Sequence, residues 1–273
     1  MQPLLGTFVE IGVVSSDTDK SHEDAIHIAI SQAFNVIALI QKLLSFHDPE
    51  SDLSKLNGAK CEWISLHPQS MRVLRLARTF TQASEHFFNC TVGGALVHEA
   101  ILPDHFGQVV LARGNAADIE FSKNSVRLRR SVLITLDGIA KGYAVDLAVQ
   151  TLQEHQITAG WINAGGDLRV FGCVTLPIQR RELDDSLQFL SEVSHCAIAT
   201  STVDVVKAAR FPGKVVSGNH YTPQPGVWTT TAPYAWKADA LTKVASLAPI
   251  AKKRALIAKL GGQLICSKEL NAA

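Results

Sequence analysis

The sequence predicts an α+β fold, in which helices and mostly antiparallel strands are mixed without the strict strand–helix–strand repeat of a parallel sheet. Three observations predict it. Apolar residues recur every three or four positions over residues 26–44, a pattern typical of an amphipathic helix. Residues 6–14 alternate between apolar and polar, as in a strand. Strand-like residues 161–163 and 168–171 flank a tight Ala-Gly-Gly-Asp turn, which indicates a hairpin.

The remaining elements follow from the same periodicities. Residues 118–136 are expected to form a hairpin that turns at 123–125, and its second strand, 126–136, leads into a helix over 143–155. Residues 50–60 are interpreted as a turn-rich linker and 180–194 as a charged surface excursion. Further helices are expected from Pro68 onward and over 234–247 and 251–260, and further strands over 195–200, 227–232 and 263–266.

Composition narrows the class of protein. The 273 residues are 47% hydrophobic and 19% charged, which is ordinary for a globular chain with a substantial core. The formal net charge of +1 does not indicate a basic face, so nucleic acid is not expected as a partner. No apolar run reaches the roughly 18 residues of a membrane span, and no signal-peptide pattern opens the chain. The five scattered cysteines have neither zinc-site nor disulfide spacing.

The stretch from Thr135 to Asp146 (TLDGIAKGYAVD) combines two glycines, one lysine and two aspartates at a predicted strand-to-helix junction. Such a turn leaves backbone N–H groups unpaired at the positive end of the helix dipole, which suits a phosphate. A glycine-containing helix cap accounts for the same residues equally well. The rest of the chain decides between these readings.

Several polar segments, taken in order, resemble the ApbE family of FAD:protein FMN transferases over nearly the whole chain. The matching segments are residues 5–11 (LGTFVEI), 45–57 (SFHDPESDLSKLN), 88–93 (FNCTVG), 138–146 (GIAKGYAVD), 162–172 (INAGGDLRVFG), 197–201 (AIATS) and 238–241 (ADAL). The resemblance implies a single ApbE-like domain spanning residues 1–273. It also implies binding of FAD and a divalent cation, usually Mg²⁺, and transfer of FMN to a Thr or Ser hydroxyl of a target flavoprotein with release of AMP.

Carried over position by position, the resemblance implies catalytic roles for His220 and Asp239. It implies metal ligation by Gly138, Asp239 and Thr242. The positions implied in FAD binding are Leu5, His47, Phe87, Phe88, Asn89, Thr135, Asp137, Lys141 and Tyr221. Many family members are exported to the periplasm, although no leader is recognisable here.

Two departures from the family pattern bear on the metal. The usual ending A-D-A-L-x-T places a threonine ligand where this chain has Lys243, and Thr242 lies one position early, about 100° round a helix. A charged lysine is a donor only and cannot ligate a metal. An aspartate usual in the family is Thr135 here, and Asp137 is expected to substitute for it. Two alternatives therefore stay open: a protein that binds or carries FAD without transfer, and a Mg²⁺-dependent FAD pyrophosphatase.

Overall fold

The computed structural model describes residues 1–15, 20–203, 215–216 and 221–265, and within them the expected α+β fold is confirmed. Its centre is a seven-stranded sheet in the order β1-β2-β5-β6-β9-β10-β11, in which every neighbouring pair is antiparallel. The strands are β1 (Gln2–Leu4), β2 (Thr7–Val13), β5 (Gly160–Ala164), β6 (Asp167–Phe171), β9 (Ala197–Val203), β10 (Gly226–Ala232) and β11 (Gln263–Ile265).

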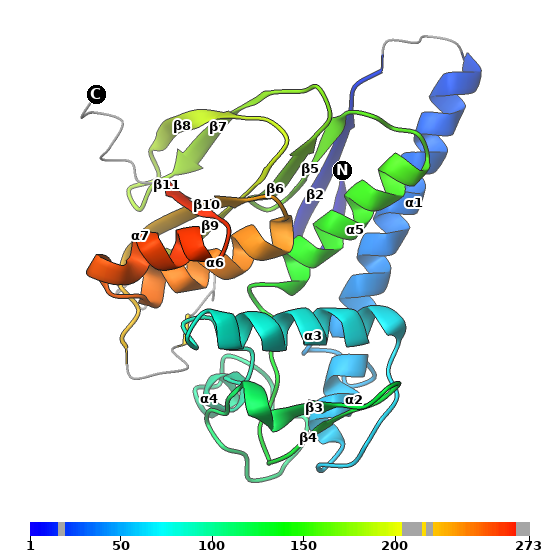
Figure 1. The fold of residues 1–273 in the computed structure, drawn as a ribbon. Coiled ribbons are helices and arrows are strands. Elements are labelled where there is room, and N and C mark those ends of the chain that lie inside the picture. The colour runs from blue at the N-terminus through cyan, green and yellow to red at the C-terminus, as the bar shows by residue number, and fades with distance from the viewer. Residues whose placement is uncertain (16–19, 204–214, 217–220, 266–273) are drawn as a thin grey trace.

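Helices pack on this sheet as Figure 1 shows. α5 (Ala140–Glu154) contacts β5 and β6, and α6 (Ala235–Leu247) contacts β6, β9 and β10. α1 (Lys20–Leu44) lies alongside α5, and α7 (Ile250–Lys259) packs on α6 and β11. α5 and α6 also contact each other, and Gly142 in the first turn of α5 lies against Ala235 at the start of α6.

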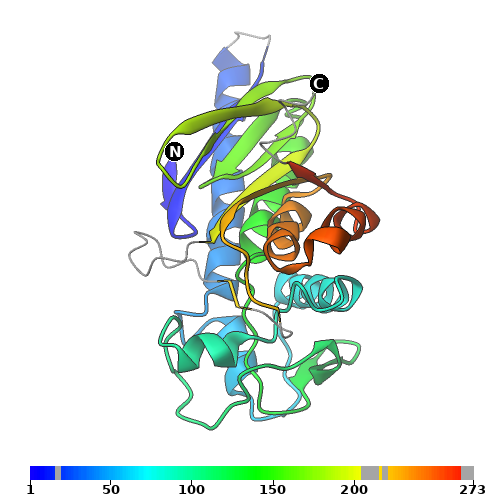
Figure 2. The same cartoon turned by 90° about the vertical axis from the view of Figure 1, so that its left-hand side faces the viewer.

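A smaller group of elements lies beyond one end of α1, as both views show (Figures 1 and 2). α3 (Pro68–Ala83) runs between this group and the sheet-covering helices. The other members are α2 (Asp52–Gly58), α4 (Gly93–His98), the short helix Ala116–Asp118, and the hairpin of β3 (Ile119–Phe121) and β4 (Val126–Leu128).

The expected strand over 126–136 is wrong beyond Leu128, where β4 ends. The backbone groups of the next residues bond to loops and to a side chain instead of a neighbouring strand. Thr135 N–H donates to the carbonyl of Cys90, and Ile134 N–H donates to the side chain of Asn57. The run of buried residues at 132–136 therefore reflects burial of the segment from all sides, without pairing to a neighbouring strand.

Two further expectations are corrected. Residues 50–60 contain the helix α2, whose N-cap Ser51 accepts a hydrogen bond from Ser54 N–H at 3.0 Å. The charged excursion at 180–194 belongs to a two-stranded hairpin of β7 (Leu176–Arg181) and β8 (Leu187–Val193). The sequence does not show this alternation clearly, because the last two residues of β7 are both arginines although Arg180 is buried and Arg181 is exposed.

The expectation that no stretch could span a membrane also needs a correction. Residues Ser21–Leu44 within α1 are long and apolar enough to qualify. This is weak evidence, because the core helices of water-soluble proteins pass the same test. In the fold, the buried face of α1 packs against α5.

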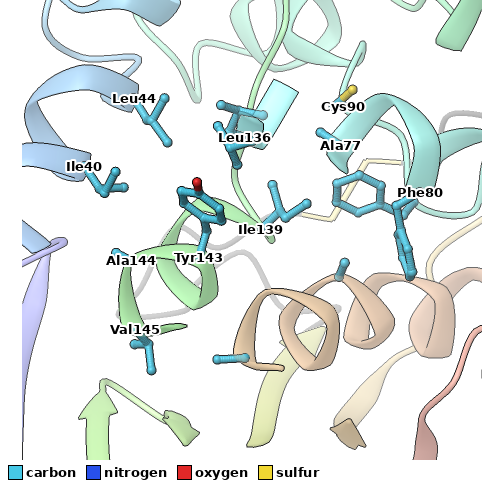
Figure 3. Close-up of a cluster of buried hydrophobic side chains, with 14 of the residues drawn as sticks. Ile40, Leu44, Ala77, Phe80, Cys90, Leu136, Ile139, Tyr143, Ala144 and Val145 are labelled. Atoms are coloured by element: carbon cyan, nitrogen blue, oxygen red, sulfur yellow. The ribbon is translucent and has the colours of Figure 1, made fainter. Parts of the chain in front are cut away.

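The hydrophobic core anchors the residues that precede α5. Leu136 and Ile139 are both almost completely buried, as is the ring of Tyr143 one turn into the helix. The Tyr143 hydroxyl donates a 2.5 Å hydrogen bond to the side chain of Gln69. Figure 3 shows the neighbours of these three residues in the core, among them Ile40, Leu44, Ala77, Phe80 and Cys90. Buried side chains on both sides thus fix the polar turn between Leu136 and Ile139.

Candidate active site

The turn before α5 allows the side chain of Lys243 to lie close to its backbone at Gly138. Gly138 has a φ of +90°, a conformation that favours glycine. A Cβ at this position would lie 2.6 Å from Cε of Lys243, which reaches over from α6. Among the described residues no side chain caps the start of α5 at Ile139. The turn therefore presents an uncapped helix N-terminus beside a lysine, an arrangement suited to an anionic ligand.

Lys141 and Asp167 form the first ion pair of the site. Asp167 begins β6 directly after the Gly165-Gly166 turn, and its carboxylate is buried. Lys141 Nζ in the first turn of α5 lies 3.3 Å from Asp167 Oδ2. The pKa of Asp167 is raised to about 7, chiefly by burial and then by the nearby charge of Asp239, whereas Lys141 and Lys243 oppose the shift. The pKa of Lys141 is raised, chiefly by the charge of Asp167.

Asp239 and Lys243 form the second pair, one helical turn apart on α6. Asp239 is 4% exposed, and Lys243 Nζ lies 3.4 Å from its Oδ1. Lys243 also donates to Ser201 Oγ on β9 at 2.8 Å and to Thr242 Oγ1 at 3.1 Å. Oδ2 of Asp239 is buried and has no hydrogen-bond partner among the described residues. That oxygen is available to a ligand.

These contacts bring three elements together at one place. Gly138 and Lys141 from the start of α5 meet Asp239 and Lys243 from α6, and β6 contributes Asp167. We call the four side chains of Lys141, Asp167, Asp239 and Lys243 the charged cluster; they carry two negative and two positive formal charges. A bound pyrophosphate would place its negative charge beside both lysines. The turn before α5 and the acid at 239 therefore lie on either side of Lys243.

A buried carboxylate holds the starts of α5 and α6 in register. Asp146 accepts hydrogen bonds from Ala235 N–H and Trp236 N–H, both at 2.9 Å, at the first turn of α6. Arg169 on β6 donates to the same carboxylate. Asp146 thus caps α6, the helix that carries Asp239 and Lys243, from a position on α5.

The residues predicted to ligate a metal surround an ammonium group. The turn at Gly138, the carboxylate of Asp239 and the hydroxyl of Thr242 all contact the side chain of Lys243. Thr242 Oγ1 donates to the carbonyl of Asp239 at 2.7 Å and is 2.7 Å from Ser201 Oγ, so it is already engaged. Among the described residues no group of three or more His, Cys, Asp or Glu side chains is placed to hold a metal ion. This arrangement does not fit a divalent cation, which would be repelled by the ammonium.

The other predicted flavin-binding residues fall in separate places. Phe87 is buried and its ring lies 5.3 Å from that of Tyr221, which is 47% exposed. Thr135 is buried and its hydroxyl accepts from the N–H of the exposed Asp137 at 3.3 Å. His220 lies outside the described residues.

Two more positions of that set, Phe88 and Asn89, have local structural partners. Phe88 is 2% exposed and stacks edge-on against Phe80. Asn89 accepts from Thr91 N–H at 2.9 Å and donates to the carbonyl of Gly114.

The last two positions, Leu5 and His47, lie near the C-terminal end of α1. Leu5 has a φ of +57° and donates its N–H to Gln41 in α1 at 2.5 Å. His47 is exposed just after α1 ends at Leu44. No hydrogen bond between either residue and the charged cluster is found in the part of the chain that the structure describes.

Sequence reasoning missed the role of Asp167 and Ser201 as neighbours of the two lysines. Both residues lie in segments that resemble the ApbE family, 162–172 and 197–201, but neither was assigned a role. The local signal for Asp167 was its place directly after Gly165-Gly166, because such a tight turn fixes the first residue of the returning strand. Ser201 carried no local signal beyond its position near the end of a buried strand.

Comparison with known proteins identifies the class to which this fold and site belong. The model of the ApbE family matches residues 5–266, and the chain belongs to the ApbE family. A curated relative is the FAD:protein FMN transferase of Klebsiella pneumoniae (strain 342), 23% identical over 175 residues. The match covers 59% of this chain and spans only about half, 53%, of the length of that relative.

Solved structures share the fold. The apbe protein of Thermotoga maritima matches with a TM-score of 0.79 at 23% identity, covering 96% of this chain and 91% of that one. The flavin transferase ApbE of Vibrio cholerae matches with a TM-score of 0.74 at 18% identity, covering 93% and 88%. The flavinyl transferase ApbE of Pseudomonas stutzeri, in its apo form, matches at 0.75 and 17%, covering 93% and 85%.

Proposed function

We propose that this protein is an FAD:protein FMN transferase, which moves FMN from FAD to a Thr or Ser hydroxyl of a target flavoprotein and releases AMP. Membership of the ApbE family and the name of the curated relative support the reaction class. The observation that carries the proposal is the convergence of Lys141, Asp239 and Lys243 at an uncapped helix start. Two cations beside a helix N-terminus suit a pyrophosphate.

The chemistry assigns a task to each group. The acceptor hydroxyl oxygen attacks the phosphorus of the FMN half, a new phosphoester bond forms, and the bond to the bridging oxygen breaks. AMP leaves with that oxygen and the electron pair of the broken bond. Lys141 and Lys243 stabilise the charge that develops on the phosphoryl oxygens. The hydroxyl proton passes to a base, for which His220 is the predicted residue.

Asp239 has two tasks in this scheme. Its Oδ1 holds the ammonium of Lys243, and its Oδ2 is buried without a hydrogen-bond partner among the described residues. That second oxygen is placed to accept a hydrogen bond from the ligand or from the incoming hydroxyl. Replacing Asp239 by Asn removes the charge while keeping the size of the side chain. We expect this change to lower the rate of transfer at least about tenfold.

The proposal is tested by incubating the protein with FAD and a flavoprotein that carries an acceptor threonine, in parallel with EDTA and with Mg²⁺. Flavin fluorescence that remains on the denatured target, with one AMP released per adduct, supports the transferase. Asp239→Asn should lose this signal, whereas Asp24→Asn on the exposed side of α1 should keep it.

Other outcomes separate the alternatives. FMN and AMP without an adduct would identify an FAD pyrophosphatase. Intact FAD that stays bound would identify a carrier. The carrier is favoured by one observation, the lysine that stands at the expected threonine ligand. A protein that leaves all FAD free in solution would exclude the three functions together.

A further inference from the structure

Lys243 is held in a defined position, although lysine side chains are usually mobile. Its Nζ lies 2.8 Å from Ser201 Oγ, 3.1 Å from Thr242 Oγ1 and 3.4 Å from Asp239 Oδ1. The three oxygens come from two elements, β9 and α6. The side chain is only 22% exposed. Three oxygens on one side of the ammonium hold it in place.

The turn before α5 leaves room for this side chain. A Cβ on Gly138 would lie 2.6 Å from Cε and 3.3 Å from Nζ of Lys243, so only glycine accommodates the lysine in this position. The ammonium therefore lies between the α5 turn and the Asp239 carboxylate. The three residues predicted as metal ligands, Gly138, Asp239 and Thr242, are the same residues that surround it.

We propose that Lys243 takes the place of the divalent cation at this site, so that the protein binds the pyrophosphate of FAD without Mg²⁺. The inference rests on the proposed function, because it concerns the same ligand. A lysine supplies a point charge and hydrogen-bond donors to a phosphate. It supplies one positive charge where Mg²⁺ supplies two, and Lys141 across the site provides the second. A divalent cation on Asp239 would lie next to the ammonium and be repelled.

The test measures FAD binding by equilibrium dialysis or flavin fluorescence, in EDTA and in excess Mg²⁺, with no acceptor protein present. Wild-type protein is expected to bind FAD with the same affinity in both buffers. Lys243→Met removes the charge and keeps the length of the side chain. It should weaken FAD binding about tenfold or more in both buffers.

Lys243→Thr is the decisive variant, because it removes the ammonium and places a hydroxyl at the position where the family pattern has one. It should weaken FAD binding in EDTA and regain affinity when Mg²⁺ is added. Mn²⁺ alone, followed by its electron paramagnetic resonance, should bind this variant and not the wild type. The matched control is Lys252→Met on the exposed side of α7, which should behave as wild type. Circular dichroism confirms that each variant is folded.

The outcomes separate this inference from the function on which it rests. Wild-type protein that binds FAD only when Mg²⁺ is present, or a Lys243→Met variant with unchanged affinity, would overturn the lysine substitution and leave the flavin-transfer proposal standing. Wild-type protein that binds FAD in neither buffer would overturn the proposed function itself. The wild-type comparison needs no variant to fold.

Discussion

Asn57 shows how one side chain positions the residues that lead into the site. Its amide donates to the carbonyl of Ile134 at 2.9 Å and accepts from Ile134 N–H at 2.7 Å. Both residues are buried, so neither backbone group can turn to water. An amide satisfies both groups at once, which an ionised carboxylate cannot do because it has no donor. Asn57 thus takes over the pairing that a neighbouring strand would otherwise provide for the approach to Thr135.

We therefore expect Asn57→Ala to lower the free energy of unfolding by about 2–4 kcal/mol, because it leaves two buried backbone groups unpaired. Urea denaturation measures the loss. The control is Asn35→Ala on the exposed side of α1, where alanine is the better helix former and the effect should be close to zero. Equal stabilities of the two variants would show that Ile134 finds other partners.

The functional residues differ in how far sequence could place them. Asp239 and Lys141 were identified because their segments match the family pattern, and both lie in the charged cluster. Asp167 and Ser201 lie in matching segments too, but they were assigned no role, since their importance comes from contacts between segments far apart in the chain. Lys243 was visible as a departure from the pattern, but only the fold shows which oxygens it contacts.

At the scale of elements, the close crossing of α5 and α6 fixes the geometry of the charged cluster. A Cβ on Gly142 would lie 2.3 Å from the carbonyl oxygen of Ala235, so the backbones of the two helices nearly touch. Asp146, one turn later on α5, caps the start of α6. The glycine sets the distance between the helices and the aspartate sets their relative position along the crossing.

Gly142→Ala is accordingly expected to destabilise the protein, against the helix propensity of alanine, which alone would favour it by up to about 1 kcal/mol. Separating the helices should cost about 1–3 kcal/mol, seen as a Tm lower by roughly 2–4 °C per kcal/mol. FAD affinity should fall as well, because Lys141 and Lys243 move apart.

The matched control is Gly58→Ala at the end of α2. There a Cβ would meet Phe106 at an ordinary 3.5 Å. This variant should be as stable as the wild type or more so. A Gly142→Ala protein that gains stability like the control would show that the helices can move apart freely.

Periodicity predicted the elements that bury one regular face and failed for those that do not. The strands β5, β6 and β10 were expected within one residue of their bounds. The predicted start of α3 at Pro68 and the predicted end of α1 at Leu44 are also correct, whereas α1 begins at Lys20 and not at residue 26. The segment 129–136 was expected as a strand because its apolar residues are buried, but its hydrogen bonds go to loops and to Asn57. The helix α2 was missed because it is seven residues long and rich in polar side chains.

At the scale of the whole molecule, one hydrophobic cluster joins the sheet and the smaller group of elements below α3. It includes Leu53 of α2, Leu74 of α3, Ile139 before α5, Ile162 of β5 and Leu241 of α6. A continuous core of this kind is the mark of a single cooperative unit. It supports the proposal that residues 1–273 form one domain, with the candidate active site on helices that the shared core holds in place.

This continuity predicts a single unfolding transition. Trp161 lies on β5, and Trp63 lies next to Arg127 of β4, at 4.7 Å from the guanidinium carbon to the ring centroid. Two variants that each keep only one of these tryptophans would report on the two parts separately. Their fluorescence transitions in urea should coincide with each other and with far-ultraviolet circular dichroism, because neither part can lose its side of the cluster alone. Two separated midpoints, or a calorimetric enthalpy well above the van't Hoff value, would instead mean that the parts unfold independently and that the charged cluster is held by α5 and α6 without help from the smaller group.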